Sequence, residues 1–258
     1  QQEGIFRYKD LLLMLISRDI KIRYKQSIMG FFWAVLMPIL IVGSGLIVMV
    51  VFSTISGRPI DKADVLSVAA KAVPWAFFVA AIRFGTNSLV ANKELVTKIY
   101  FPRAIMPLAS VLASFFDFVV AESVLALVLV IARVGVSVHL LWFPVLLVVL
   151  LLFTAGLALL LACANLFFRD VKYLVEVVLT YGIFFTPVFY SAGKLGKWGW
   201  ILMLNPLGPI LEGMGNVLVL HQPLALNWLM YAAAWSVVLF LAAWKIFNKS
   251  EAAFAEAI

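Results

Sequence analysis

Long stretches without a charged residue are the feature that most constrains how this chain can fold. No Asp, Glu, Lys or Arg occurs in the runs 26–57, 134–168, 177–193 and 213–244. About 20 apolar residues in a helix cross the roughly 30 Å hydrocarbon core of a bilayer. Only 13% of the residues are charged, against about 25% in an average soluble domain. The sequence therefore predicts an all-α integral membrane protein and excludes a single soluble domain.

Six transmembrane helices are predicted when two further apolar stretches, each interrupted by isolated charges, are added. One contains Arg83, and the other contains Asp117 and Glu122. The helices form one transmembrane domain over residues 1–258. We place the spans near residues 31–55, 72–92, 104–132, 141–166, 173–192 and 224–245.

The segment that follows the fifth span is broken by turn-forming residues. Six of the fifteen glycines and two prolines lie between residues 193 and 215. Within it, the apolar run 198–211 is too short to cross a bilayer. We therefore expect residues 193–216 to form two short re-entrant helices that dip into the outer leaflet.

The distribution of basic residues predicts the orientation of the spans. With the N-terminus inside, thirteen of the twenty Lys and Arg residues fall in inner segments and six in outer segments, with Arg83 inside the membrane. Lys and Arg are in excess on the cytoplasmic side of such proteins. A seventh crossing at 198–211 would weaken this excess, because it would move Lys245 and Lys249 outside. The apolar cluster 11–16 is too short for a secretory signal. We expect both termini in the cytoplasm.

A basic segment with a short apolar run precedes the first span. Residues 5–25 include Arg18, Lys21, Arg23 and Lys25, a composition typical of a helix that lies in the membrane interface. In one interpretation this is a basic flank that only fixes orientation. In the other it is a collar at a cytoplasmic entrance that attracts anionic lipid headgroups or a lipid pyrophosphate. Charge alone favours neither.

The loop between the second and third spans is short and charged. Residues 92–103 are predicted to be helical as far as Pro102, which terminates a helix. The apolar residues Leu95, Ile99 and Phe101 could present a face to a second protein. A solvated connector is the simpler interpretation on spacing alone.

Four ionisable residues lie within or just inside the spans: Arg83, Asp117, Glu122 and Glu176. Charges at this depth are costly unless they face the bundle interior, a partner or water, so each is a functional candidate. An ion pair of Arg83 with Asp117 or Glu122 that only holds helices together explains them as well as a transport role does. Glu176 is the weakest candidate, because Lys172 lies four residues earlier and can pair with it.

Three aromatic residues of the fifth span, Tyr181, Phe185 and Phe189, recur every four residues and are predicted to share one helical face. Rings in a membrane span usually pack or anchor it. If this face lines a channel, the same rings would give a smooth wall for sugars. The periodicity does not choose between the two.

Several functional classes find no support in the residues. There is no G-x-x-x-x-G-K-[ST] phosphate loop, so we expect this chain to bind no ATP. His139 and His221 have no Cys or carboxylate at metal-ligand spacing, and they lie too peripherally to serve an intramembrane serine protease at Ser44. We expect no metal site. Cys163 cannot form an internal disulfide. The net charge of +7 is spread between apolar runs, so we expect no nucleic-acid partner.

Four motifs stand in order along nearly the whole chain. They are SRDIKIRYKQSIMGFFWAVLMP at 17–38, the run from Asn92 through YFPR at 100–103 to Pro107, FRDVKY at 168–173 followed by TPVFY at 186–190, and NPLGP at 205–209. Together they resemble the type-2 ABC exporter permeases for polysaccharides, which are the membrane subunits of O-antigen, teichoic-acid and capsule exporters.

The resemblance implies a homodimer in the bacterial cytoplasmic membrane, with an N-terminal amphipathic interface helix and two outer gate helices between spans five and six. Two separate nucleotide-binding subunits would bind ATP and Mg²⁺ and push on cytoplasmic coupling helices. The coupling residues implied by position are Lys93, Glu94, Leu95, Lys98, Ile99, Tyr100 and Arg103, with Arg169 and Asp170 as a secondary contact. The cargo would be a polysaccharide linked to a polyprenyl pyrophosphate. Its diphosphate would be received by the entrance residues Arg18, Lys21, Arg23 and Lys25. Its polyprenyl chain would stay in contact with the membrane lipid.

Two other transport classes stay open. One is an ABC exporter of a small molecule or drug, and the other is a channel or secondary carrier without an ATPase. A membrane-embedded glycosyl-lipid enzyme would need convergent acids or a metal site near the inner interface. Asp19, Glu94 and Asp170 form no such motif.

Overall fold

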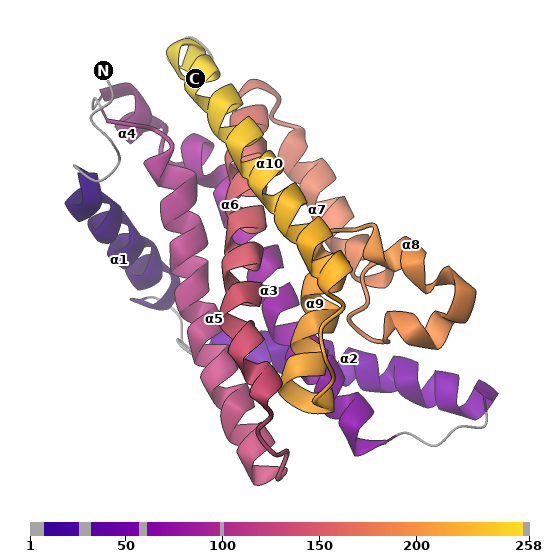
Figure 1. Ribbon diagram of the computed structural model, residues 1–258. Helices are drawn as coiled ribbons and strands as arrows, with labels where there is room; N and C mark the ends of the chain where they lie inside the picture. The colour runs from indigo at the N-terminus through magenta and orange to yellow at the C-terminus, as the bar shows by residue number, and fades with distance from the viewer. Residues whose placement is uncertain (1–7, 26–31, 57–60, 99–100, 255–258) are drawn as a thin grey trace.

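The computed structural model describes residues 8–25, 32–56, 61–98 and 101–254, and all regular secondary structure in these ranges is helical (Figure 1). The prediction of an all-α protein is therefore confirmed. Four helices of the described residues are long and apolar enough to cross a membrane: α3 (Lys62–Ala91), α5 (Ile105–Ile131), α6 (Phe143–Phe167) with the turn before it, and α10 (Leu226–Ser250).

Helix α3 is the centre of the bundle. It packs against α5, α6 and α9 (Leu207–Gly215), and its apolar side chains contribute much of the core. Trp75, Phe77 and Phe78 of α3 are buried. The Phe77 ring meets Phe118 of α5, and the Phe78 ring meets Phe153 of α6 and Trp75. Because lipid tails are as apolar as these side chains, tight packing rather than burial from water holds such helices together.

Helices α6 and α10 approach closely at Gly156. A Cβ atom built on Gly156 would lie 2.9 Å from the backbone N and Cα of Phe240. Small residues at such crossings let two backbones come together. The absence of a side chain at this position therefore sets the distance between α6 and α10.

We expect Gly156→Ala to destabilise the folded protein by about 1–3 kcal/mol, the usual cost of overpacking, because backbone atoms of α10 cannot move aside as a side chain can. Thermal unfolding of the detergent-purified protein measures the effect. Gly43→Ala is the control, since nothing lies within 4 Å of a Cβ at that position. Equal stability of the two variants would contradict the close approach.

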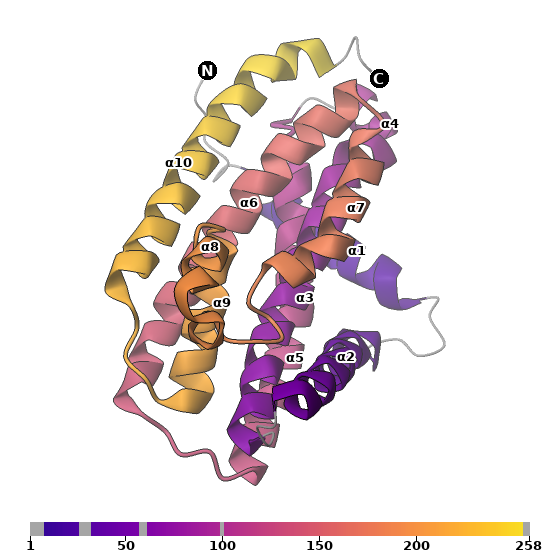
Figure 2. The same cartoon turned by 90° about the vertical axis from the view of Figure 1, so that its right-hand side faces the viewer.

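The first predicted span is present as a helix, α2 (Phe32–Ser56). It runs across the long helices rather than along them (Figures 1 and 2), and it contacts α3 and α5. At Gly45 a Cβ atom would lie 2.7 Å from Phe189 and 2.9 Å from Val68. The helix is thus placed by a close contact with the bundle, while its crossing of the membrane stays a prediction.

The fifth predicted span, 173–192, is not one helix. Helix α7 (Val171–Gly182) ends after twelve residues and continues only as the 3₁₀ turn Ile183–Phe185. Thr186 is extended, with φ −126° and ψ 139°. A proline disfavours helical geometry in the residue before it and lacks the N–H that a helix needs. Pro187 therefore ends the helix, and the prediction of a continuous span here is wrong.

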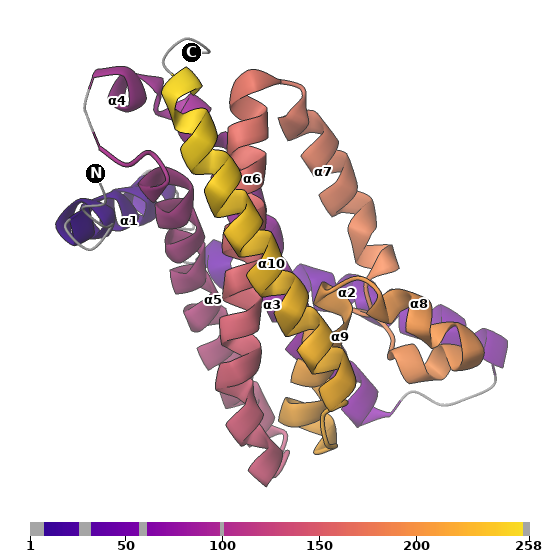
Figure 3. The same cartoon turned by 45° about the horizontal axis from the view of Figure 1, so that its top comes forward.

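Two short helices follow within the predicted segment 193–216, after the 3₁₀ turn Ala192–Trp198. They are α8 (Gly199–Met203) and α9, and α9 continues as the π-helical turn Asn216–Leu220. Helix α7 leads from one end of the bundle to its middle, and α9 leads on from the middle to the opposite end (Figures 1 and 3). Ile210, Leu211 and Met214 of α9 are fully buried, so this half-helix packs inside the bundle.

The break between α7 and α9 is closed by side chains. The Thr186 hydroxyl donates to the Gly182 carbonyl oxygen at 2.8 Å, and Asn205 Nδ2 donates to Thr186 Oγ1 at 3.2 Å. Asn205 Oδ1 in turn accepts from the Leu207 backbone N–H at 3.2 Å. Irregular backbone at membrane depth is tolerated where protein groups satisfy it. The TPVFY and NPLGP motifs therefore meet at this junction.

The connections fall at two ends of the bundle. Helix α4 (Lys93–Lys98), the turn at 168–170 and the end of α10 lie at one end, shown at the top of Figure 1. The turn Val138–Trp142 contacts the π-helical turn at the other end. Three of the predicted inner segments thus lie together, and the predicted outer turn at 138–142 lies at the opposite end. Which end faces the cytoplasm stays a prediction.

Candidate functional site

Helix α1 (Lys9–Lys25) is attached to α5 by a row of polar contacts. It crosses α5 in the half of the bundle that is nearer to α4 (Figures 2 and 3). Leu15 of α1 is buried against Ile105 and Ala109 of α5. Helical periodicity places Ser110, Ser114 and Asp117 on one face of α5, and this face meets the polar side of α1. We call this row the α1–α5 junction.

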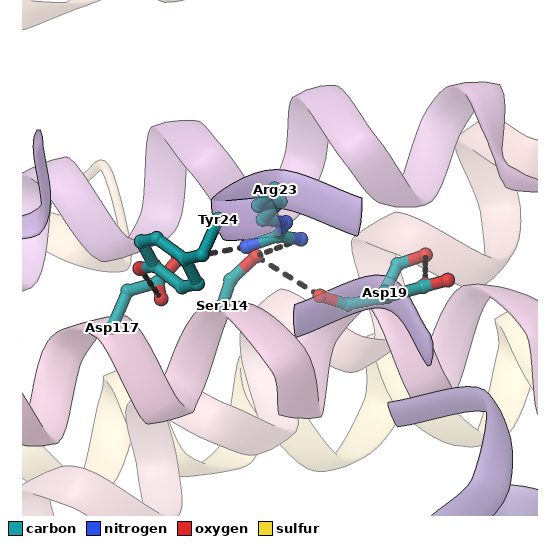
Figure 4. Close-up of polar contacts among 6 residues, drawn as sticks. Asp19, Arg23, Tyr24, Ser114 and Asp117 are labelled. Carbon is teal, nitrogen blue, oxygen red and sulfur yellow. Dashed lines mark hydrogen bonds and ion pairs between the residues drawn. The ribbon is translucent and has the colours of Figure 1, made fainter. Parts of the chain in front are cut away.

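Figure 4 shows how the side chains of the α1–α5 junction converge. Arg23 Nη1 donates to Asp117 Oδ2 at 2.8 Å and Arg23 Nη2 donates to Ser114 Oγ at 3.2 Å. The Tyr24 hydroxyl donates to the other oxygen of Asp117. The Ser110 hydroxyl donates to Asp19 Oδ2 at 3.3 Å. Every acidic group of the junction therefore accepts a hydrogen bond from a neighbouring helix.

The Arg23–Asp117 ion pair is largely shielded. The two side chains are 14% and 21% exposed, and the Arg23 guanidinium lies 3.9 Å from the centre of the Phe84 ring of α3. Burial, reinforced by the hydrogen bond to Asp117, raises the pKa of the Tyr24 hydroxyl, so this phenol stays a donor. Since charge within a membrane protein needs a partner, the junction explains how Asp117 is tolerated on α5.

The four predicted entrance cations have different environments. Arg23 is engaged by Asp117, and Arg18 forms an ion pair with the adjacent Asp19 at 2.9 Å. Lys21 is exposed. Lys25 is the last residue of α1, and its side chain lies outside the described part of the structure. Of the three side chains that are described, Lys21 is the one turned outward.

Another ion pair joins α3 to α7. Arg83 Nε and Nη2 donate to the two carboxylate oxygens of Glu176 at 2.6 and 2.7 Å. Arg83 therefore pairs with Glu176 and not with Asp117 or Glu122, and Lys172 lies over the Tyr173 ring at 4.7 Å instead of pairing with Glu176. Both expected pairings were wrong, because spacing along the chain does not reveal which face of α3 meets α7.

The Arg83–Glu176 pair borders an open cleft between α3 and α7. The two side chains are 47% and 44% exposed, and the cleft has a volume of about 340 Å³. Its other lining residues are Phe84, Thr86, Asn87, Lys172, Tyr173 and Val175. Phe84 separates this cleft from the α1–α5 junction, because its ring also stacks on Arg23.

Glu122 lies further along α5 than Asp117. Its carboxylate oxygen Oε2 is buried and, within the described residues, accepts no hydrogen bond. Neither Arg23 nor Arg83 contacts it, since both are held by other acids. The three predicted intramembrane charges thus have separate environments.

An ion pair between α3 and α9 was missed by the sequence analysis. Lys71 of α3 is 1% exposed, and its Nζ donates to the Tyr190 carbonyl oxygen at 2.9 Å and lies 3.6 Å from Glu212 of α9. Lys71 was assigned to an outer segment because α3 begins ten residues earlier than predicted. The sequence did contain a signal for this pair, because Lys71 and Glu212 are each an isolated charge within an apolar stretch.

The predicted coupling residues surround the end of the bundle that carries α4. Lys93, Glu94, Arg169 and Asp170 are exposed there. Leu95 is half-buried, whereas Ile99 and Tyr100 and the side chain of Lys98 lie outside the described residues. Phe101 is 7% exposed and packs inside the protein. It is therefore not part of an outward apolar face, which the sequence analysis had left as the alternative to a solvated connector.

Arg103, the remaining residue of this set, is held by the C-terminal segment. Its backbone N–H donates to Glu251 Oε1 at 2.8 Å, and its Nη1 donates to the Glu251 carbonyl oxygen at 2.6 Å. No sequence pattern pointed to this contact, because the two residues are 148 positions apart.

The three aromatic residues proposed as channel lining do not share one face. Tyr181 and Phe185 are 61% and 72% exposed, but Phe189 is 4% exposed. Phe189 lies beyond Pro187, where the chain has left the helix, and it packs against Phe184 and beside Gly45 of α2. The predicted face is therefore wrong for Phe189 and leaves Tyr181 and Phe185 as the outward rings.

The described residues contain four helices that are long and apolar enough to cross a membrane, which is typical of an integral membrane protein. Residues 10–219 match the model of the ABC-2 type transporter family. The chain therefore belongs to the ABC-2 transporter membrane family, whose members are transport subunits, and the resemblance inferred from its motifs is confirmed.

Full-length relatives carry a more specific name. The chain is 29% identical to the O-antigen export system permease protein RfbA of Myxococcus xanthus, over 98% of this chain and 97% of the relative. It is 26% identical to an O-antigen export system permease protein RfbA of Klebsiella pneumoniae, over 96% of this chain and 94% of the relative. The similarity thus extends over nearly the whole length of both proteins.

Proposed function

We propose that this chain is the permease subunit of an ATP-driven ABC exporter that moves a polysaccharide linked to a polyprenyl pyrophosphate across the bacterial cytoplasmic membrane. The full-length similarity to O-antigen export permeases, within the ABC-2 family, carries the proposal. The long apolar helices and the separation of the connections to two ends support it.

The proposed topology has six crossings with both termini in the cytoplasm. Helices α3, α5, α6 and α10 are four of these, and α7 with α9 shares a fifth. We assign α2 as the remaining crossing in the assembled transporter. Helix α1 is the interface helix, because it lies across α5 with its apolar residues Leu13, Met14 and Ile22 exposed. Helices α8 and α9 are the outer gate, and α9 is thus both a gate helix and the outer half of the fifth crossing.

The proposed energy source is a separate subunit. The sequence has no phosphate loop, so ATP and Mg²⁺ are assigned to two ATPase subunits that bind a homodimer of this chain. Helix α4 is the principal contact, with Arg169 and Asp170 as the secondary one. These residues are clustered at one end of the bundle, where a single partner can reach both (Figure 1).

The proposed path for the polymer lies beside α7. Tyr181 and Phe185 project from this region, and aromatic rings offer sugars flat apolar surfaces. The half-exposed Arg83–Glu176 pair supplies polar groups on the same side of α3. A hydrated chain of sugars could therefore slide along alternating aromatic and polar groups.

The diphosphate of the cargo is proposed to approach α1 from its exposed side, where Lys21 is turned outward. One lysine near an anionic surface is worth about 1 kcal/mol. We expect Lys21→Ala to raise the half-saturating concentration of lipid-linked substrate by about fivefold, because each loss of about 1.4 kcal/mol in binding free energy weakens the affinity tenfold. The matched control is Lys9→Ala, at an exposed position at the other end of α1. Equal effects of the two substitutions would refute a specific role of Lys21.

The experiment that tests the function is export by inverted membrane vesicles that contain this chain and its ATPase subunit. We expect a lipid-linked polysaccharide to enter the vesicle lumen only when ATP is hydrolysed. Export that persists without the ATPase would favour a channel or carrier. ATP-dependent movement of small drugs, without movement of the polysaccharide, would favour a small-molecule exporter.

A further inference from the structure

The C-terminal segment Glu251–Phe254 folds over the end of the bundle that carries α4 and the α6–α7 turn (Figures 1 and 2). Glu251 accepts two hydrogen bonds from Arg103, one from the backbone N–H and one from the guanidinium. Arg103 lies just before α5, and Glu251 lies just after α10. The segment therefore ties the start of one long helix to the end of another.

Phe254 fixes the segment in an apolar pocket. The side chain is 0% exposed, and its ring centre lies 5.1 Å from that of Phe247 and 5.9 Å from that of Phe167. The Arg103 guanidinium lies 5.9 Å from the same ring. Phe167 ends α6, one residue before the turn that leads to α7. One ring thus touches groups next to both predicted coupling loops.

Helix α4 depends on this pocket for its position. It has six residues, and a helix this short does not hold itself together in water. Val96 of α4, 1% exposed, and Phe101 after it belong to the same apolar cluster as Phe247 and Phe254. The packing that positions α4 on the long helices therefore includes the C-terminal segment.

We propose that Glu251 and Phe254 are positioning residues for ATP coupling, an inference that rests on the proposed function. They hold the α4 loop and the α6–α7 turn against the ends of α6 and α10. A push on α4 then moves the long helices, whereas a loosened loop would absorb the same push by bending.

The test compares export per ATP hydrolysed in vesicles that contain the complex. We expect Glu251→Ala combined with Phe254→Ala to lower this ratio by about two- to thirtyfold, the range that substitutions along coupling networks produce, with ATP hydrolysis largely kept. Glu251→Gln retains an oxygen acceptor for the Arg103 N–H and should stay near wild type. Lys249→Ala, at an exposed position on the same end of α10, is the control.

A second measurement does not need the ATPase. Hydrogen exchange of the Arg103 amide in the purified chain should speed up in Glu251→Ala, because its acceptor is removed, and stay slow in Glu251→Gln. Faster exchange with a lowered export ratio supports the proposal. An unchanged export ratio overturns the proposal. It is also overturned if ATP hydrolysis and export fall in parallel while hydrogen exchange of the Arg103 amide is unchanged. If the wild-type complex itself couples no export to ATP, the proposed function fails instead.

Discussion

Replacing Lys71 by methionine should be among the most destabilising single substitutions in this chain. The Lys71 side chain is 1% exposed and that of Glu212 is 13% exposed, so the change leaves a shielded carboxylate without its cation. It also removes the donor to the Tyr190 carbonyl oxygen. Breaking a buried ion pair from one side costs about 3–5 kcal/mol. Thermal unfolding of the detergent-purified protein, followed by circular dichroism, measures the loss.

Two further variants make the Lys71 result interpretable. Lys245→Met changes an exposed lysine of α10 and should shift stability by less than about 0.5 kcal/mol. Lys71→Met combined with Glu212→Gln should recover part of the loss, because no unpaired charge remains. A Lys71→Met variant as stable as the Lys245→Met control would show that the pair does not hold α9 against α3.

Replacing Arg23 by alanine is the second substitution with a large expected effect. It removes the cation of a pair whose side chains are 14% and 21% exposed and leaves Asp117 on a membrane helix with only neutral donors. We expect a loss near the lower limit for buried pairs, about 3 kcal/mol. Export should fall as well, since α1 loses its main polar attachment to α5. Protease sensitivity of α1 and thermal unfolding give the two measurements.

Two variants test whether the attraction between Arg23 and Asp117, and not merely the loss of a cation from α1, explains the effect. Arg18→Ala removes a cation that is 32% exposed and pairs with the adjacent Asp19, so we expect it to lower the free energy of unfolding by about 0.5 kcal/mol or less. The exchanged pair, Arg23→Asp with Asp117→Arg, should be more stable than either single change. If the exchanged pair is no better than the worse single variant, attraction between these two residues is not what attaches α1.

Both ends of α5 and α6 and the start of α10 could be predicted from the sequence. The ends of α5 and α6 fall within two residues of the predicted spans, and α10 begins within two. These limits follow from the run of apolar residues, which is a local property of the chain. Helix α3 begins at Lys62, ten residues before the predicted start of its span. The prediction failed because Lys71 was taken as a sign of the membrane surface, although Glu212 pairs with it inside the bundle.

The pairing of charges could not be predicted in the same way. Arg83, Asp117 and Glu176 were all identified as unusual, yet their partners depend on which helices become neighbours. Asp117 pairs with α1 and Arg83 pairs with α7. The same limit applies to Phe189, whose spacing from Tyr181 suggested a shared face. That inference assumed a helix that Pro187 does not allow.

The division of one crossing between α7 and α9 has a mechanical consequence. In an unbroken helix the backbone hydrogen bonds form one ladder, so the two ends move together. Here the α-helical ladder of α7 stops at Gly182 and that of α9 begins at Leu207, with only short turns and α8 between them, and the side chains of Thr186 and Asn205 join the halves. A displacement that begins beside Asp170 therefore has no continuous backbone ladder to follow to α9, and it can reach α9 only through these side chains or through α3 and α6, which contact both halves.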